Sequence, residues 1–176
     1  MKIPSLALTH FVLIFLLSLD VAKADSYTWQ VPSGDWDVPA NWGGVVPTSA
    51  DTVLMTSGTA FVPAAASAQY RSFQTDGAPG PACTVNVTGG LVSGTSAIFG
   101  VGGTNQGTLN VSSGTWNTVS TLTLGYVGKG TLTVDGGLVS NLQTVLGSTA
   151  NGIGEATIMS GTLQSSYLRL SKEICG

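Results

Sequence analysis

The feature that most constrains this chain is a motif that returns every 23–25 residues. Each copy alternates aliphatic residues with Thr or Asn and then enters a Gly-rich turn; the copies begin at Thr59, Thr84, Thr108, Thr131 and Glu155. A constant period of this length is typical of solenoids, because one unit is too small to bury its apolar face and must stack on the next. An antiparallel β-sandwich also has many short strands, but it does not predict a motif at constant spacing. The sequence therefore favours a solenoid over a sandwich.

Alternation with period two predicts which side chains face the core. In "TLTV", Leu132 and Val134 point one way while Thr131 and Thr133 point the other. The same inward pair recurs as Val85/Val87, Leu109/Val111 and Ala156/Ile158, and a second block repeats the rule as Ala97/Phe99, Leu122/Leu124, Thr144/Leu146 and Leu168/Leu170. We predict an all-β fold: a right-handed parallel β-helix of about five coils of 23–25 residues, with about three strands per coil.

The outward positions of the same motif should form two columns on one face of the solenoid. They are Thr84/Asn86, Thr108/Asn110, Thr131/Thr133 and Glu155/Thr157. Residues two apart in a strand share a face, so each pair places one member in each column. Columns of Thr on a flat face are reminiscent of ice-binding proteins, but Asn and Glu interrupt these columns. The plainer interpretation is that Thr suits an exposed strand, being β-branched and polar.

The first 24 residues have the features of an export signal. Lys2 precedes a nine-residue apolar core, residues 11–19 (FVLIFLLSL), and residues 22–24 (AKA) form an A-x-A cleavage site. An uncleaved membrane anchor is the less favoured alternative, because this core is too short to span a bilayer. We expect a mature chain that begins at Asp25, carries no membrane span, and is secreted or displayed on the outer cell surface.

The predicted mature chain divides into two parts. Residues 25–51 carry three of the four Trp and are predicted to form an N-terminal cap over the first coil. Residues 52–176 hold the solenoid repeats and stop within a repeat, at "SKEICG". Two alternatives follow for that end: the chain is a truncated fragment of a longer protein, or its last coil is covered by oligomerisation.

Composition excludes several classes of function. Removing the leader leaves four basic residues, Arg71, Lys129, Arg169 and Lys172, too few and too scattered for a nucleic-acid surface. The single histidine of the sequence lies within the leader, so a His-based triad or zinc site is not expected. Of the two cysteines, Cys83 is predicted to be buried and Cys175 to be free, although a disulfide between them stays open. We expect no metal, no cofactor and no nucleic-acid partner.

Residues 27–55, "YTWQVPSGDWDVPANWGGVVPTSADTVLM", resemble a tryptophan-rich opening that precedes G-T-L-T-V-x-G-G repeats in bacterial exported proteins. Two such groups are the autotransporter-associated β-strand repeat proteins and the repeat proteins with a PEP-CTERM sorting tail. The resemblance covers nearly all of the predicted mature chain. It implies an exported, β-helical, passenger-like region with a role in display, adhesion or matrix formation.

Two functional hypotheses remain. The first is a secreted or surface-displayed structural and adhesive module without catalytic activity, whose partners are extracellular glycans or other copies of the chain. The second is a carbohydrate-active enzyme or glycan-binding module centred on Trp36, Asp37 and Trp42, with Asp35 as the second carboxylate that glycoside hydrolysis requires. A cap in which these Trp residues cover the first coil is the plainer explanation of the same segment. Ice binding is a third, remote alternative.

Overall fold

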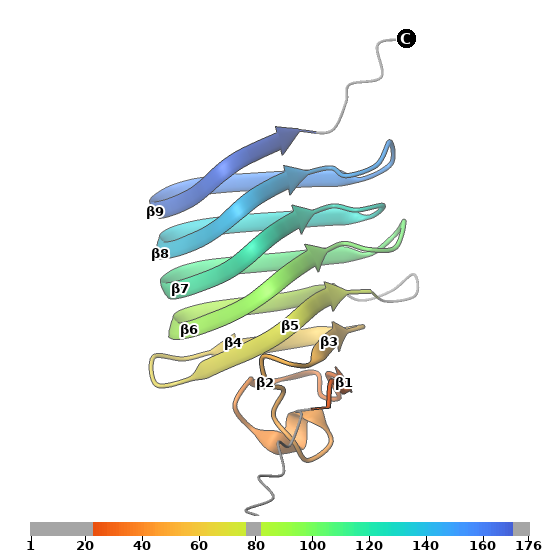
Figure 1. Ribbon diagram of the computed structural model, residues 1–176, viewed down its shortest axis with the longest axis vertical. Coiled ribbons are helices and arrows are strands. Elements are labelled where there is room, and N and C mark those ends of the chain that lie inside the picture. Colours follow the sequence, from red (N-terminus) through yellow and green to blue (C-terminus); the bar gives the residue numbers. More distant parts are fainter. Residues whose placement is uncertain (1–22, 77–81, 171–176) are drawn as a thin grey trace, which may run out of the picture.

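The computed structural model describes residues 23–76 and 82–170 as one continuous coil of parallel β-strands (Figure 1). In chain order, its elements are β1 (Ser26–Thr28), β2 (Ser33–Asp35), the 3₁₀ helix η1 (Pro39–Trp42), β3 (Thr52–Met55), β4 (Gly58–Val62), β5 (Ser67–Thr75), β6 (Cys83–Phe99), β7 (Gln106–Leu124), β8 (Lys129–Leu146) and β9 (Ile153–Leu170). Every strand pairing that joins them is parallel. The coil advances right-handed along a single axis, as predicted.

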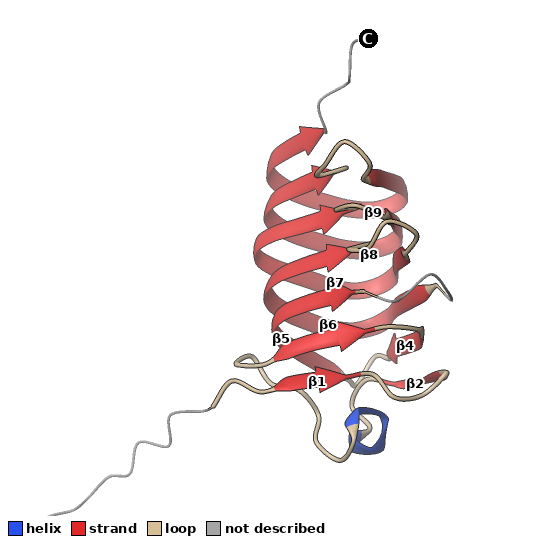
Figure 2. Cartoon of the chain, turned by 90° about the vertical axis from the view of Figure 1, so that its right-hand side faces the viewer, coloured by secondary structure: helices blue, strands red, loops and turns tan. Residues whose placement is uncertain are grey.

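Each later coil is one long strand bent at its corners. Strands β6 to β9 contain 17, 19, 18 and 18 residues, and each runs round most of a turn (Figure 2). Shifts in the register between β6 and β7 fall between Val87 and Leu91 and between Gly94 and Ala97. These shifts divide the pairing between β6 and β7 into three segments, although each of these coils is a single strand.

The hydrogen-bonded register follows the sequence repeat. Thr59 pairs with Thr84, Thr84 with Thr108, Thr108 with Thr131, and Thr131 with Glu155. The spacing found by comparing sequence motifs is therefore the number of residues in each coil. The predicted parallel β-solenoid is confirmed.

The number of coils is slightly larger than predicted. The face that contains the motif is built in the order β2, β4, β6, β7, β8, β9, which is six rungs rather than about five. The additional rung is β2, which lies within the segment expected to be only a cap. Its sequence, "SGD", contains no aliphatic residue, so the alternating pattern could not reveal it.

Inward side chains stack into a continuous apolar column. The predicted inward pairs of β6, β7 and the first segment of β8 are all buried: Val85/Val87, Ala97/Phe99, Leu109/Val111, Leu122/Leu124 and Leu132/Val134. Gly125 marks the corner at which the chain leaves the core after one such segment. Its φ is +73°, and a Cβ at this position would lie 2.2 Å from the carbonyl oxygen of Ile153, the first residue of β9. Glycine recurs at this corner because a side chain would disrupt both the turn and the stacking of coils.

The two ends of the solenoid differ. The first coil is closed by η1 and the tryptophan cluster described below, whereas β9 pairs only with β8 among the described residues. Ile158, Leu168 and Leu170 of β9 continue the inward columns but are 43%, 62% and 65% exposed. We call this surface of β9 the open end. No helix within the described residues is long and apolar enough to cross a membrane.

Candidate functional site

The structure places the predicted glycan-binding tryptophans in the core of the cap. Trp36 is completely buried and Trp42 is 3% exposed. The Trp42 ring packs edge-on against Trp29 and Trp36, with ring centroids 4.8 Å and 4.7 Å apart, and its Nε1–H donates to the Trp36 carbonyl oxygen at 2.6 Å. Neither ring presents a face on which a sugar could stack. The cap interpretation of these two residues fits this geometry, and the glycan-platform interpretation does not.

The two carboxylates of the same segment lie on the surface without a shared partner. Asp35 ends β2, Asp37 follows in the turn before η1, and both side chains are exposed. Asn41 secures this turn by donating from Nδ2 to the Asp35 carbonyl oxygen at 2.8 Å. No ordered acid and base pair across a cleft results from this arrangement, so the local geometry offers the two-carboxylate hypothesis no support.

A surface hollow lies between the loop after β1 and the start of β4. It has a volume of about 410 Å³, and its walls include Trp29, Val31, Pro32 and Gly58. None of the residues that line it is titratable. The described residues also contain no group of three or more His, Cys, Asp and Glu side chains that could hold a metal ion. This hollow therefore has no groups for acid–base chemistry.

The outward columns are the most regular surface feature of the molecule. The register stacks Thr84, Thr108, Thr131 and Glu155 in one column and Asn86, Asn110, Thr133 and Thr157 in the other, as predicted. We call these two columns the polar face. Asn110 donates from Nδ2 to Oδ1 of Asn86 at 2.9 Å, and Lys129 pairs with Glu155 at 2.9 Å along one side. Neighbouring coils thus hold the polar face in register through their side chains as well as their backbones.

A polar group also lies inside the solenoid, where the alternation pattern predicted only packing. Tyr70 of β5 is fully buried, and its hydroxyl lies 2.9 Å from Oγ1 of Thr118 in β7. Trp116 donates from Nε1 to the same Oγ1 at 2.9 Å. Burial raises the pKa of Tyr70, since the phenolate would be desolvated, and the hydrogen bond to Thr118 opposes this only in part. This cluster is neutral and structural.

Tyr70 spans two coils because the residue between it and Thr118 is glycine. The register places Tyr70 beside Gly94 and Gly94 beside Thr118. A Cβ on Gly94 would lie 2.0 Å from Cε2 of the Tyr70 ring. The sequence signal is weak but present: in this column of inward positions, a large aromatic residue is followed one coil later by glycine.

The cysteine predictions have different outcomes. Cys83 is buried, as predicted, and its thiol donates to the Met55 carbonyl oxygen at 3.2 Å. Burial, with a smaller contribution from the charge of Asp76, raises the pKa of Cys83 to about 11, so this thiol is protonated and unreactive at neutral pH. Cys175 lies outside the described residues, and its pairing stays a prediction.

Sequence reasoning missed one well-defined polar site, at the start of the first coil. Asp51 is 4% exposed, although it lies in the connection between η1 and β3. Its Oδ1 accepts from the backbone N–H of Asp25 at 3.0 Å, and its Oδ2 accepts from the N–H and the hydroxyl of Thr48, each at 2.7 Å. The spacing T-x-x-D, residues 48–51, is the local signal that predicts such a side-chain cap.

No protein-family model matches the chain, and no curated protein or solved structure has a significant match to it. The resemblance to exported bacterial repeat proteins therefore stays a prediction from the residues that carry it.

Proposed function

We propose that this chain is an exported, non-catalytic structural module that acts by adhesion through its polar face. The observation that carries the proposal is the regular stacking of Thr and Asn side chains on one face of the solenoid. Repeated hydroxyl and amide groups favour weak contacts that gain strength by multivalency, as with the chains of an extracellular polysaccharide. The leader-like residues 1–24 support export.

The first expected result is that the chain binds polysaccharides without cleaving them. The mature chain should sediment with insoluble polysaccharides and leave their chain length unchanged, because the candidate carboxylates Asp35 and Asp37 are exposed and do not face each other across a cleft. Thr108→Glu with Asn110→Glu should reduce the bound fraction several-fold by placing two charges on the polar face. Ser67→Glu with Gln69→Glu adds the same two charges to exposed positions of β5 and serves as the matched control.

Two outcomes would contradict this proposal. One is depolymerisation of a polysaccharide that is lost in Asp35→Ala or Asp37→Ala, which would show an enzyme. The other is thermal hysteresis that disappears in Thr131→Tyr with Thr133→Tyr, which would show that the polar face binds ice instead of glycans.

We propose further that copies of the chain associate through the open end. The β9 strand leaves a whole backbone edge unpaired within the described structure, and the strand itself exposes the apolar side chains of Ile158, Leu168 and Leu170. An uncovered edge of this kind is a template for pairing with another chain. Two copies that meet end to end would cover both open ends, because the opposite end of each copy is closed by its cap.

The expected result is a dimer in light scattering whose population rises with protein concentration. Ile158→Lys or Leu168→Lys should shift it to monomer, because each introduces a charge into the covered surface. Val119→Lys is the matched control, since Val119 is an exposed apolar residue on the side of β7. A wild-type chain that stays monomeric at all concentrations would contradict self-association.

A further inference from the structure

The buried carboxylate of Asp51 carries no counter-charge from the residues that contact it. Its three hydrogen-bond donors, the N–H of Asp25 and the N–H and hydroxyl of Thr48, are neutral. Two cations lie near it and neither pairs with it: Arg71 of β5 is exposed and directs its guanidinium to Oγ1 of Thr52 at 3.4 Å, and Lys23 is exposed and pairs with Asp25. Burial alone would raise the pKa of Asp51, but the three hydrogen bonds outweigh it, so the pKa lies below the ordinary value and the group is ionised at neutral pH.

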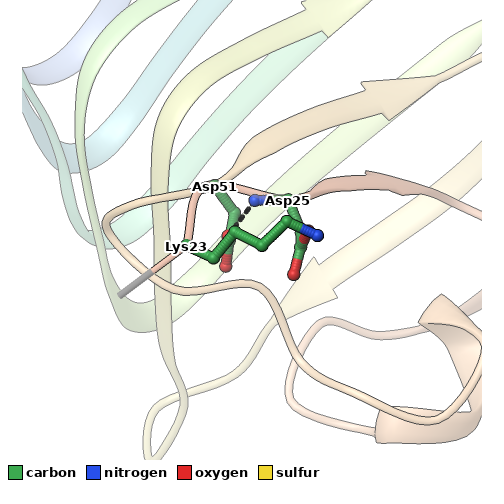
Figure 3. A network of polar contacts seen from close by, with 3 residues as sticks. All are labelled: Lys23, Asp25 and Asp51. Atoms are coloured by element: carbon green, nitrogen blue, oxygen red, sulfur yellow. Dashed lines mark hydrogen bonds and ion pairs between the residues drawn. The ribbon is translucent and has the colours of Figure 1, made fainter. Parts of the chain in front are cut away.

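The nitrogen that contacts Oδ1 of Asp51 is the first backbone atom of the predicted mature chain. Figure 3 shows Asp51 receiving the hydrogen bond from the Asp25 nitrogen, with Lys23, two residues earlier in the chain, beside it. The position of Asp25 is fixed independently, because its carbonyl oxygen accepts from the N–H of Thr52 at 2.8 Å and β1 pairs with β3 directly after it. Lys23 and Ala24 are exposed.

We propose that Asp51 is the receptor site for a processed N-terminus, in which the α-ammonium group of Asp25 forms a partly buried ion pair with its carboxylate. The inference rests on the proposed export, which supplies the endopeptidase that cleaves after Ala24. In that step the bond between the Ala24 carbonyl carbon and the Asp25 nitrogen breaks. Water gives its hydroxyl to the carbon and a proton to the nitrogen, and the new amine takes a further proton from solvent.

Processing therefore exchanges a weak interaction for a stronger one. The precursor has an exposed ion pair between Lys23 Nζ and Asp25 Oδ1, 3.3 Å apart, which contributes little because solvent screens it. Cleavage removes Lys23 and places a positive charge about 3 Å from a carboxylate that is shielded from water, where a charged hydrogen bond is stronger than a neutral one. The mature chain is consequently more stable than the precursor, because cleavage during export creates this ion pair.

The experiment compares chains that differ only at their first residue. Residues 25–176 are released from a cleavable fusion that leaves Asp25 as the first residue, and the control retains Ala24, which moves the ammonium group one residue away. The α-amine of Asp25 should titrate above the usual 7.7–8.0 in NMR, and the melting temperature should exceed that of the control by several degrees at pH 7. A group whose pKa is raised on folding stabilises below its unfolded pKa, so this advantage should disappear as the pH rises through the folded value.

Asp51→Asn tests the receptor directly, because the amide keeps hydrogen-bonding capacity but not charge. In this variant the two chains should have equal melting temperatures and an unshifted α-amine. An Asp25 amine that titrates at its ordinary value in the wild-type chain, or an advantage that persists in Asp51→Asn, would overturn the inference. The mass of the product from an exporting host reports cleavage separately, so a failure of export is distinguished from a failure of the ion pair.

Discussion

Gly94→Ala should lower the free energy of unfolding by about 3 kcal/mol, the upper end of the usual cost of inserting a methyl group into a packed core. The added Cβ would lie 2.0 Å from Cε2 of Tyr70, and the ring cannot move away without leaving Thr118. Displacing Tyr70 also breaks a buried hydrogen bond, which leaves the Tyr70 hydroxyl without a direct partner, while Thr118 keeps the N–H of Trp116. Urea denaturation followed by far-ultraviolet circular dichroism measures the loss.

A matched glycine distinguishes this clash from the general effect of replacing glycine. A Cβ on Gly103 would meet only Cγ1 of Val127, at 3.7 Å, so Gly103→Ala should be close to neutral. Tyr70→Val should itself destabilise, but combined with Gly94→Ala the two losses should be less than additive, because the valine leaves room for the methyl group. Strict additivity would show that the ring does not determine the cost at Gly94.

Trp42→Ala should cost about 3–5 kcal/mol, as expected for the removal of a large buried aromatic side chain. The ring holds Trp29 and Trp36 together by edge contacts, and its N–H satisfies the carbonyl oxygen of Trp36. The loss should be visible as a lower melting temperature and a weaker near-ultraviolet circular dichroism signal. This variant therefore cannot serve as a specific probe of glycan binding.

Trp42→Phe separates packing from the hydrogen bond. It retains most of the apolar contact and removes the donor, so its cost should be clearly smaller than that of Trp42→Ala. The outcome that contradicts a structural role is a Trp42→Ala chain with unchanged stability that has lost binding to a polysaccharide.

The regular part of the fold could be predicted because one pattern encodes three properties at once. In "TLTV", the alternation identifies the strand, the aliphatic residues identify the inward face, and the distance to the next copy gives the register. In-register stacking requires equivalent positions to occupy equivalent environments, so comparison of the motifs was sufficient to pair Thr84 with Thr108 and Thr131 with Glu155.

The cap and the Asp51 site could not be predicted in the same way, because each occurs once and has no second copy for comparison. In the sequence, Trp36 and Trp42 in a polar turn favour a cap but leave a sugar platform open, and the packing of Trp42 against Trp29 and Trp36 separates the two. Thr48 is a local partner of Asp51, but its second partner, the N–H of Asp25, lies 26 residues away, just before β1. The strand β2 was missed because its pairing with β4 depends on backbone atoms alone.

The hydrogen bond between Tyr70 and Thr118 joins residues 48 positions apart, across an intervening coil. Most contacts in a solenoid act between adjacent coils, so such a molecule loses its terminal coils one at a time. The ring of Trp116 in β7 also packs on Tyr70 and Phe73 of β5, which adds to the link across the intervening coil. Fraying that starts at the open end can release β9 and then β8 without breaking this hydrogen bond. Release of β7 also requires the loss of the hydrogen bond from Thr118 to Tyr70 of β5, two coils away. β5, β6 and β7 therefore melt as a single cooperative block, and hydrogen exchange should divide the molecule at the boundary between β7 and β8.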